Sequence, residues 1–247
     1  MGPQVVAFAV INQLRASGGW IIEMSGEMLH IDPGPGALVR AKEYKVDLFK
    51  LTGLLVSHAH PDHYGDAEMV LEAMTGGAKV KRGVLIGNEN VIKGGKTYHP
   101  VFSPYHLKAV DKYVVMKAGD KTNIGKINIT ATKTVHDEPK CIGFVFEGSK
   151  KIGFTSDGEY FKGQAEYYKG CDYLVINCMI QKDYSWPGHI NVNDAAKLIK
   201  EVNPKTAILK DFSSYLLEAG PEEQIEWIEK TTGIKTIAAK DGMKLNL

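Results

Sequence analysis

The stretch at residues 57–63, Ser-His-Ala-His-Pro-Asp-His, constrains this chain more than any other part of its sequence. It brings three imidazoles and one carboxylate into six consecutive positions, a density that packing alone does not explain because buried polar groups need partners. The apolar run at 53–56 predicts a buried strand, and extended geometry puts residues two apart on one side of it. We therefore interpret four side chains as metal ligands: His58, His60, Asp62 and His63.

A helix is expected directly after these ligands. Apolar residues recur at helical spacing at Ala67, Val70, Leu71 and Met74, and the two glycines at 76–77 mark the end of the helix. The ligands then lie at a corner between a strand and a helix, where they can serve two ions.

The motif is similar to a family signature. His-x-His-x-Asp-His after an apolar strand resembles the metal-binding signature of the metallo-β-lactamase fold superfamily. The resemblance implies an α/β fold, a four-layer αβ/βα sandwich with the metals at one edge of the sheets, and a single domain over residues 1–247. Among the branches of the superfamily, the motifs are most similar to those of the phosphodiesterases, the cyclic-phosphate phosphodiesterases and the tRNase Z-like enzymes.

The resemblance also implies ligands further along the chain. His136 follows an expected strand at 127–131, where the family places its next metal ligand. Asp157, in Ser-Asp-Gly where the family usually has Gly-Asp-Thr, corresponds to a carboxylate that bridges both ions, with a plain turn as the alternative. Asp211, in Lys-Asp-Phe-Ser where the family has Thr-His-Phe-Ser, completes the second site unless it points away. The implied sets are His58, His60 and His136 for one ion and Asp62, His63 and Asp211 for the other, with Asp157 as the bridge.

Two further residues receive roles from the same resemblance. Asp32, before the Pro-Gly-Pro-Gly turn at 33–36, corresponds to a carboxylate that orients a ligand histidine, with a turn cap as the alternative. His189, before an expected helix capped by Asn193, resembles the histidine that phosphodiesterases of this fold hold over the scissile phosphate. It would act as general acid or oxyanion donor, and Asp62 and His189 are the catalytic candidates.

The chain departs from the tRNA-processing branch in two respects. Asn177-Cys178 stands where those enzymes have His-Glu, and nothing in the loop-rich stretch at 88–106 resembles their long Gly/Pro-rich arm. These differences favour a small phosphodiester over tRNA as substrate. We expect substrate choice to depend on the 88–106 stretch, where His99 and His106 could line a pocket, with a structural role as the alternative.

The expected cofactor is a pair of divalent metal ions, with zinc as the first choice. Because Asp211 replaces a histidine, the second position is mostly oxygen, and manganese or iron is an alternative there. Lys210 could offset the extra negative charge, but adjacent strand residues point to opposite faces. Lys210 is therefore expected not to reach the site.

The composition sets the class of protein. A length of 247 residues with 44% hydrophobic residues is enough for a continuous core. The net charge of +1 does not indicate nucleic-acid binding, so a small-molecule substrate is the default partner. The sequence shows neither a signal-like nor a membrane-spanning run, and its three cysteines lack metal-finger spacing. We expect a cytoplasmic protein without a membrane partner. The sequence leaves open whether the protein forms a homo-oligomer.

These observations predict a dinuclear metal-dependent hydrolase in which a bridging hydroxide attacks a small phosphodiester. A lactonase or thioesterase with the same metal centre is the first alternative. A non-catalytic member of the fold that binds a metal or a ligand is the second. At the two ends of the chain, strands are expected at 5–10 and 243–247.

Overall fold

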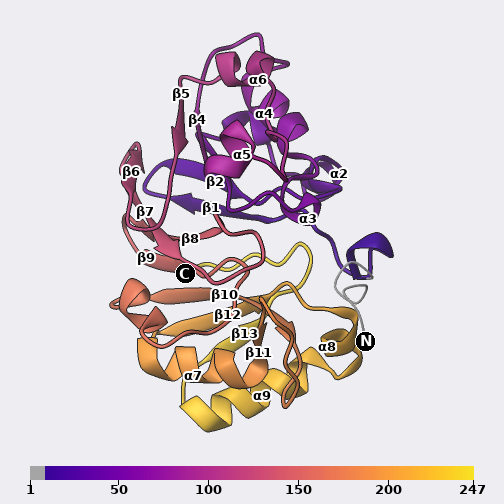
Figure 1. Ribbon diagram of the computed structural model, residues 1–247, viewed down its shortest axis with the longest axis vertical. Coiled ribbons are helices and arrows are strands. Elements are labelled where there is room, and N and C mark those ends of the chain that lie inside the picture. Colours follow the sequence, from indigo (N-terminus) through magenta and orange to yellow (C-terminus); the bar gives the residue numbers. More distant parts are fainter. Residues whose placement is uncertain (1–8) are drawn as a thin grey trace. The chain divides into compact units, whose positions relative to one another are not determined.

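The computed structural model describes residues 9–247, which divide into two compact units (Figure 1). The amino-terminal unit consists of residues 16–131 and 140–142. The carboxy-terminal unit consists, within the described range, of residues 9–15, 132–139 and 143–247. None of the described helices is both long and apolar enough to span a membrane.

The strands of the amino-terminal unit are β1 (Trp20–Met24), β2 (Glu27–Ile31), β3 (Gly53–Val56), β4 (Val84–Gly87), β5 (Lys112–Val115), β6 (Lys121–Ile124) and β7 (Ile127–Lys133), the last of which ends in the other unit. Five of them form a sheet in the order β1-β2-β3-β4-β5. The hairpin of β1 and β2 is antiparallel, as its turn residues predict, and β2 to β5 pair in parallel. A second antiparallel hairpin joins β6 and β7.

The helices of this unit connect the parallel strands. They are α2 (Ala37–Glu43), the 3-10 helix η1 (Leu48–Lys50), α3 (Pro61–Tyr64), α4 (Ala67–Thr75), α5 (Glu89–Lys93) and α6 (Pro104–Ala109). The apolar face predicted for α4 is buried in the core of the unit, and Gly76 ends the helix with φ 61°, a left-handed conformation that glycine adopts at little cost. Since β3 is also buried along its whole length, two packed elements hold the ends of the loop at 57–60.

The strands of the carboxy-terminal unit are β8 (Ile142–Glu147), β9 (Lys151–Phe154), β10 (Tyr173–Ile180), β11 (Ile190–Asn191), β12 (Thr206–Lys210) and β13 (Thr236–Ala238). Its sheet has the order β13-β12-β10-β9-β8, in which only the β8–β9 pair is antiparallel. The short strand β11 pairs in parallel with the end of β10. The carboxyl ends of β9, β10 and β12 therefore lie at the same edge of this sheet.

The helices of the carboxy-terminal unit are η2 (Gln164–Tyr168), α7 (Val192–Val202), α8 (Ser214–Glu218) and α9 (Pro221–Thr232). Figure 1 shows α7 and α9 side by side along the strands of this unit, and both contribute to its apolar core. The cap of α7 is Asn191, whose side chain accepts a hydrogen bond from the Asp194 N–H (2.8 Å). The expected cap, Asn193, is wrong, because α7 begins two residues earlier, where β11 ends.

The strands expected at the two chain ends are not formed by the described residues. Positions 5–8 of the first lie outside the described range, and Ala9 and Val10 are helical. Residues 243–247 have no regular secondary structure. An alternating pattern shows only that a segment could be half-buried, whereas a strand also needs a neighbour to pair with.

Candidate metal centre

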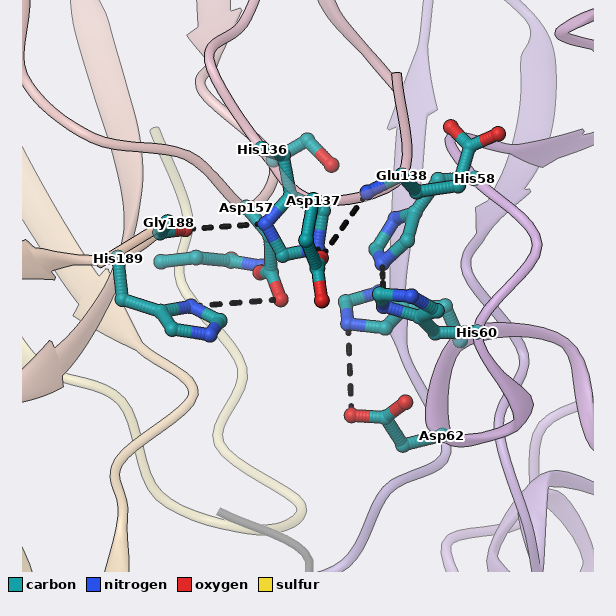
Figure 2. Close-up of polar contacts among 12 residues, drawn as sticks. His58, His60, Asp62, His136, Asp137, Glu138, Asp157, Gly188 and His189 are labelled. Atoms are coloured by element: carbon teal, nitrogen blue, oxygen red, sulfur yellow. Dashed lines mark hydrogen bonds and ion pairs between the residues drawn. The ribbon is translucent and has the colours of Figure 1, made fainter. Parts of the chain in front are cut away.

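The loop at 57–60 carries the first ligand candidates of the amino-terminal unit. His58 is fully buried and His60 half-buried, and α3 begins at Pro61, so that His60 has the extended backbone of an N-cap residue (φ −97°). The ring nitrogens His58 Nε2 and His60 Nδ1 lie 3.1 Å apart. Figure 2 shows the two rings meeting at these nitrogens, with Asp62 beside them.

A buried carboxylate, that of Asp32, organises this loop. Its Oδ1 accepts a hydrogen bond from the Ser57 backbone N–H (2.7 Å), and its Oδ2 accepts from the Ser57 hydroxyl (2.8 Å). The same Oδ2 lies 3.1 Å from His63 Nδ1, which must donate to it because an ionised carboxylate only accepts. Asp32 itself has a left-handed backbone (φ 53°), a conformation that costs non-glycine residues about 1 kcal/mol and is concentrated at functional sites.

These hydrogen bonds fix which nitrogen of each ring carries a proton. The Ser57 hydroxyl has one hydrogen and donates it to Asp32, so its contact with His58 Nδ1 at 3.0 Å must be accepted from an Nδ1–H. His58 and His63 therefore both donate from Nδ1, and the Nε2 atom of each ring faces another ligand candidate, His60 Nδ1 at 3.1 Å for His58 and an Asp62 oxygen at 3.7 Å for His63. Donation from Nδ1 is the arrangement that an imidazole needs in order to bind a metal through Nε2.

The turn after Asp32 packs against the same loop. At Gly34, a Cβ atom would overlap the carbonyl oxygens of Asp62 and Ser17. The Asp66 N–H also donates to the Pro33 carbonyl (3.0 Å). The glycine in this turn is thus required by the close approach of two backbone segments.

In the carboxy-terminal unit, His136 is oriented by a backbone carbonyl. Its Nδ1 lies 3.0 Å from the Gly188 oxygen, which can only accept, so Nδ1 carries a proton and Nε2 is turned toward Asp137 Oδ1 (Figure 2). Gly188 has φ 81°, and its N–H donates to Glu159 Oε1 (2.6 Å). Glu159 therefore fixes the Gly188 peptide group, which in turn orients His136.

Asp157 lies beyond the end of β9 and is buried, with 3% of its surface exposed. Its Oδ1 accepts a hydrogen bond from Asn177 Nδ2 (2.6 Å), and Asn177 Oδ1 accepts one from Lys210 Nζ (3.1 Å). Lys210 is therefore linked to Asp157 through the Asn177 amide, a connection that the alternation of faces did not predict. Alternation of faces holds within a strand, but β12 ends at Lys210, and Asp211 has a left-handed backbone (φ 64°).

The remaining candidates of this unit are His189 and Asp211. His189 Nδ1 is 3.9 Å from Asp157 Oδ2, and the His189 ring packs edge-on against His136 with 5.2 Å between centroids. Asp211 is half-buried, and its charge and that of Asp194 add to the effect of burial, which raises the pKa of the Cys178 thiol. Within this unit the structure thus brings His136, Asp157 and His189 together.

The donor atoms in each unit fit a divalent cation. The separation of 3.1 Å between His58 Nε2 and His60 Nδ1 is close to the about 3.3 Å expected for two nitrogens on one tetrahedral zinc ion. His63 Nε2 lies 3.7 Å from an Asp62 carboxylate oxygen, and His136 Nε2 lies 3.0 Å from Asp137 Oδ1. A proton or a cation between the ring nitrogen and the carboxylate oxygen satisfies both atoms of such a pair.

The sequence motifs did not reveal several of the residues that orient these ligands. Ser57 precedes the first ligand histidine, Glu159 follows Asp157 by two positions, and Gly188 precedes His189. Their nearness in sequence to predicted ligands was the available signal, but Glu159 acts on Gly188, 29 residues further on, and Gly188 acts on His136, 52 residues earlier. Asn177 was noted only as a departure from the tRNA-processing branch.

The two histidines of the 88–106 stretch have different surroundings. His99 is exposed. His106 on α6 lies between two carboxylates of α4, with Nδ1 2.6 Å from Glu68 Oε1 and Nε2 3.1 Å from Glu72 Oε1. His106 thus joins α6 to α4.

Comparison with known proteins identifies the family. The β-lactamase superfamily domain matches residues 28–210, a range that includes the 57–63 stretch, His136, Asp157 and His189. The protein MJ1374 of Methanocaldococcus jannaschii is 36% identical over 241 residues, which cover 97% of this chain and 91% of that protein. The chain therefore belongs to the β-lactamase superfamily. The UPF0173 metal-dependent hydrolase PYRAB05000 of Pyrococcus abyssi is 28% identical over 242 residues, 92% of this chain and 94% of that protein.

Solved structures confirm the expected fold. The metallo-β-lactamase fold protein YhfI from Bacillus subtilis has a TM-score of 0.76 at 20% identity, covering 91% of this chain and 89% of that one. A diphosphatase from the PhnP family has a TM-score of 0.66 at 19% identity, covering 92% of this chain and 83% of that one. The α/β fold of the metallo-β-lactamase type, predicted from the 57–63 motif, is therefore correct.

Proposed function

We propose that this chain is a metal-dependent hydrolase that cleaves a small phosphodiester with two divalent ions. Zinc is the first choice of metal, with manganese or iron as the alternative at the second position. The observation that carries the proposal is the orientation of the histidines: His58, His63 and His136 each donate from Nδ1 to a fixed oxygen, so that Nε2 is the nitrogen that each ring can offer to a metal.

The ligand assignment is the one that the family motif gives. His58, His60 and His136 hold the first ion, Asp62, His63 and Asp211 hold the second, and Asp157 is shared. When bound, two divalent ions lower the pKa of a water molecule and neutralise the charge that develops on the phosphoryl oxygens. The protein itself fixes the tautomers through Asp32 and the Gly188 carbonyl. His189, whose side chain is 13% exposed, is the candidate to donate a proton or hydrogen bond to a phosphoryl oxygen.

Two relatives support this choice of chemistry. The Pyrococcus abyssi relative is described as a metal-dependent hydrolase, and one fold neighbour is a diphosphatase. The latter favours attack at phosphorus over attack at the carbonyl of a lactone or a thioester. The Asn177-Cys178 departure from the tRNA-processing pattern favours a small substrate.

The test is a side-by-side assay of bis(p-nitrophenyl) phosphate, a lactone and a thioester with the metal-loaded protein. We expect turnover of the phosphodiester, its loss on treatment with a chelator and its return when zinc or manganese is added. Elemental analysis should find close to two ions per chain. His58→Ala should lower the metal content and abolish turnover, because a ligand of the first ion is lost.

The exposed His99 provides the matched control, and His99→Ala should retain both metal and turnover. Hydrolysis of only the lactone or the thioester would show that the substrate is a carbonyl compound and not a phosphodiester. A fully loaded protein without turnover of any of the three would indicate a binding protein. Undiminished hydrolysis by metal-free protein would overturn the metal-dependent mechanism altogether.

A further inference from the structure

Three residues of the carboxy-terminal unit form a hydrogen-bonded chain that ends on Asp157. Lys210 Nζ donates to Asn177 Oδ1 (3.1 Å), and Asn177 Nδ2 donates to Asp157 Oδ1 (2.6 Å). Asn177 and Asp157 are each 3% exposed, so these bonds are shielded from water. Asn177 and Lys210 are direct partners in the β10–β12 ladder, and therefore their side chains lie on the same face of the sheet.

The direction of the bonds follows from chemistry. A lysine ammonium can only donate, and an ionised carboxylate can only accept. The amide between them must therefore present its oxygen to Lys210 and its NH₂ group to Asp157. Asp157 already selects the NH₂ end of the Asn177 amide, and Lys210 holds the oxygen end, so that the side chain is fixed at both ends.

The same chain distinguishes the two carboxylate oxygens of Asp157. Oδ1 is engaged by the amide, whereas Oδ2 faces His189 Nδ1 at 3.9 Å. Hydrogen bonds to a metal-binding carboxylate fix its orientation and commonly decide which oxygen binds the ion. The cationic end of Lys210 also brings a positive charge close to a site in which Asp211 replaces a histidine.

We propose that Lys210 and Asn177 are positioning residues that hold Asp157 so that Oδ2 is its ligand oxygen. This inference rests on the proposed function in one respect, the role of Asp157 as a metal ligand. Lys210 acts through Asn177 and does not touch the metal.

The test measures zinc binding directly. Chelator-treated protein is titrated with Zn²⁺ in competition with a chromogenic chelator, which gives dissociation constants without any assay of turnover. Lys210→Met and Asn177→Leu should raise the dissociation constant about 10- to 100-fold, the usual effect of removing an orienting partner. Lys210→Arg should retain most of the affinity, since a guanidinium also donates. Lys200→Met, which removes an exposed lysine of α7, is the matched control and should bind zinc like the wild type.

A second measurement does not depend on metal. Hydrogen exchange of the Asn177 side-chain NH₂, followed by NMR in zinc-free protein, should be slow in the wild type and in Lys200→Met, and faster in Lys210→Met. Wild-type zinc affinity in Lys210→Met, or equal exchange in all three proteins, overturns the inference. A wild type that binds no zinc overturns the proposed function and the ligand role of Asp157, while the exchange measurement still decides whether Lys210 fixes the amide.

Discussion

The amino-terminal and carboxy-terminal units orient their candidate ligands in different ways. In the amino-terminal unit the four candidates lie within residues 58–63, and one buried carboxylate, Asp32, holds the loop through both of its oxygens. In the carboxy-terminal unit the candidates are spread from His136 to Asp211. Two of them have separate supports, the Gly188 carbonyl for His136 and the Asn177 amide for Asp157.

The two units differ in the charge of the groups that hold the ligands and in the number of residues that share this role. A buried carboxylate that accepts three hydrogen bonds is expensive to remove, because every donor loses its partner at once and each unmet buried donor costs about 1–3 kcal/mol. Removal of a neutral carbonyl or amide partner costs less free energy, and each such partner can be lost separately. We therefore expect the amino-terminal ligands to depend on one residue, and the carboxy-terminal ligands to depend on several residues with smaller effects.

The largest expected effect is that of Asp32→Ala. It leaves the Ser57 N–H, the Ser57 hydroxyl and the His63 Nδ1–H without their acceptor, and should lower the free energy of unfolding by about 3–5 kcal/mol. Asn177→Ala, the matching change in the other unit, should cost about 1–3 kcal/mol. Urea unfolding of both metal-free variants measures the two values.

An exposed aspartate controls for the loss of a carboxylate in general. Asp47 caps η1 by accepting from the Phe49 N–H (3.1 Å), and Asp47→Ala should cost no more than about 1 kcal/mol. Equal costs for Asp32→Ala and Asn177→Ala would show that the two units do not differ in how they hold their ligands.

The same contrast explains how much of the molecule could be predicted from its sequence. The amino-terminal candidates are contiguous, and an apolar strand and an amphipathic helix frame them, so local patterns were enough to place the loop at a strand-to-helix corner. The fold class followed from that motif. The assignment of the ligands to two ions stays a prediction.

The carboxy-terminal supports could not be predicted, because they depend on which strands are neighbours. Lys210 reaches Asn177 since β10 and β12 pair in register, which no local pattern records. The alternation of faces is also a poor guide at the end of β12, since the left-handed backbone at Asp211 ends the strand. The strand expected at 243–247 failed because a strand needs a partner as well as a pattern.

A second expected effect makes the amino-terminal unit sensitive to acid. His30 on β2, two residues before Asp32, donates its Nε2–H to the Gly18 carbonyl (2.7 Å), and burial lowers the pKa of His30 from 6.5 to about 4. Between these two values the unfolded chain binds a proton that the folded chain does not, so stability falls as the pH falls. The loss should be on the order of 3 kcal/mol from pH 7 to pH 4, with no further contribution from His30 below that range.

The measurement is the free energy of unfolding of the wild type and of His30→Leu as a function of pH. Other groups titrate over the same range, so the difference between the two curves is the quantity of interest. The wild type should lose its advantage over His30→Leu as the pH falls from 7 to 4. Parallel curves would show that His30 is not held neutral by burial. His99→Leu, at an exposed position, controls for the removal of a histidine.

The smallest expected effect tests whether the carboxy-terminal supports are separable from one another. Glu159 Oε1 accepts the Gly188 N–H (2.6 Å), and the Gly188 carbonyl accepts from His136 Nδ1. Glu159→Ala should speed hydrogen exchange of the Gly188 amide about tenfold, the equivalent of about 1.4 kcal/mol of local opening, with little change in global stability because Glu159 is only half-buried. NMR exchange rates measure the effect.

Glu159→Gln discriminates between the charge and the hydrogen bond, since the amide oxygen of glutamine can still accept from Gly188. If the hydrogen bond is what matters, Glu159→Gln should exchange nearly as slowly as the wild type. Glu166→Ala, which removes an exposed partner of Lys169, should leave Gly188 unchanged. The Asn177 side-chain amide should also be unaffected by Glu159→Ala, because its partners are Asp157 and Lys210. Faster exchange at both Gly188 and Asn177 would mean that the carboxy-terminal ligands share one support after all, as the amino-terminal ligands share Asp32.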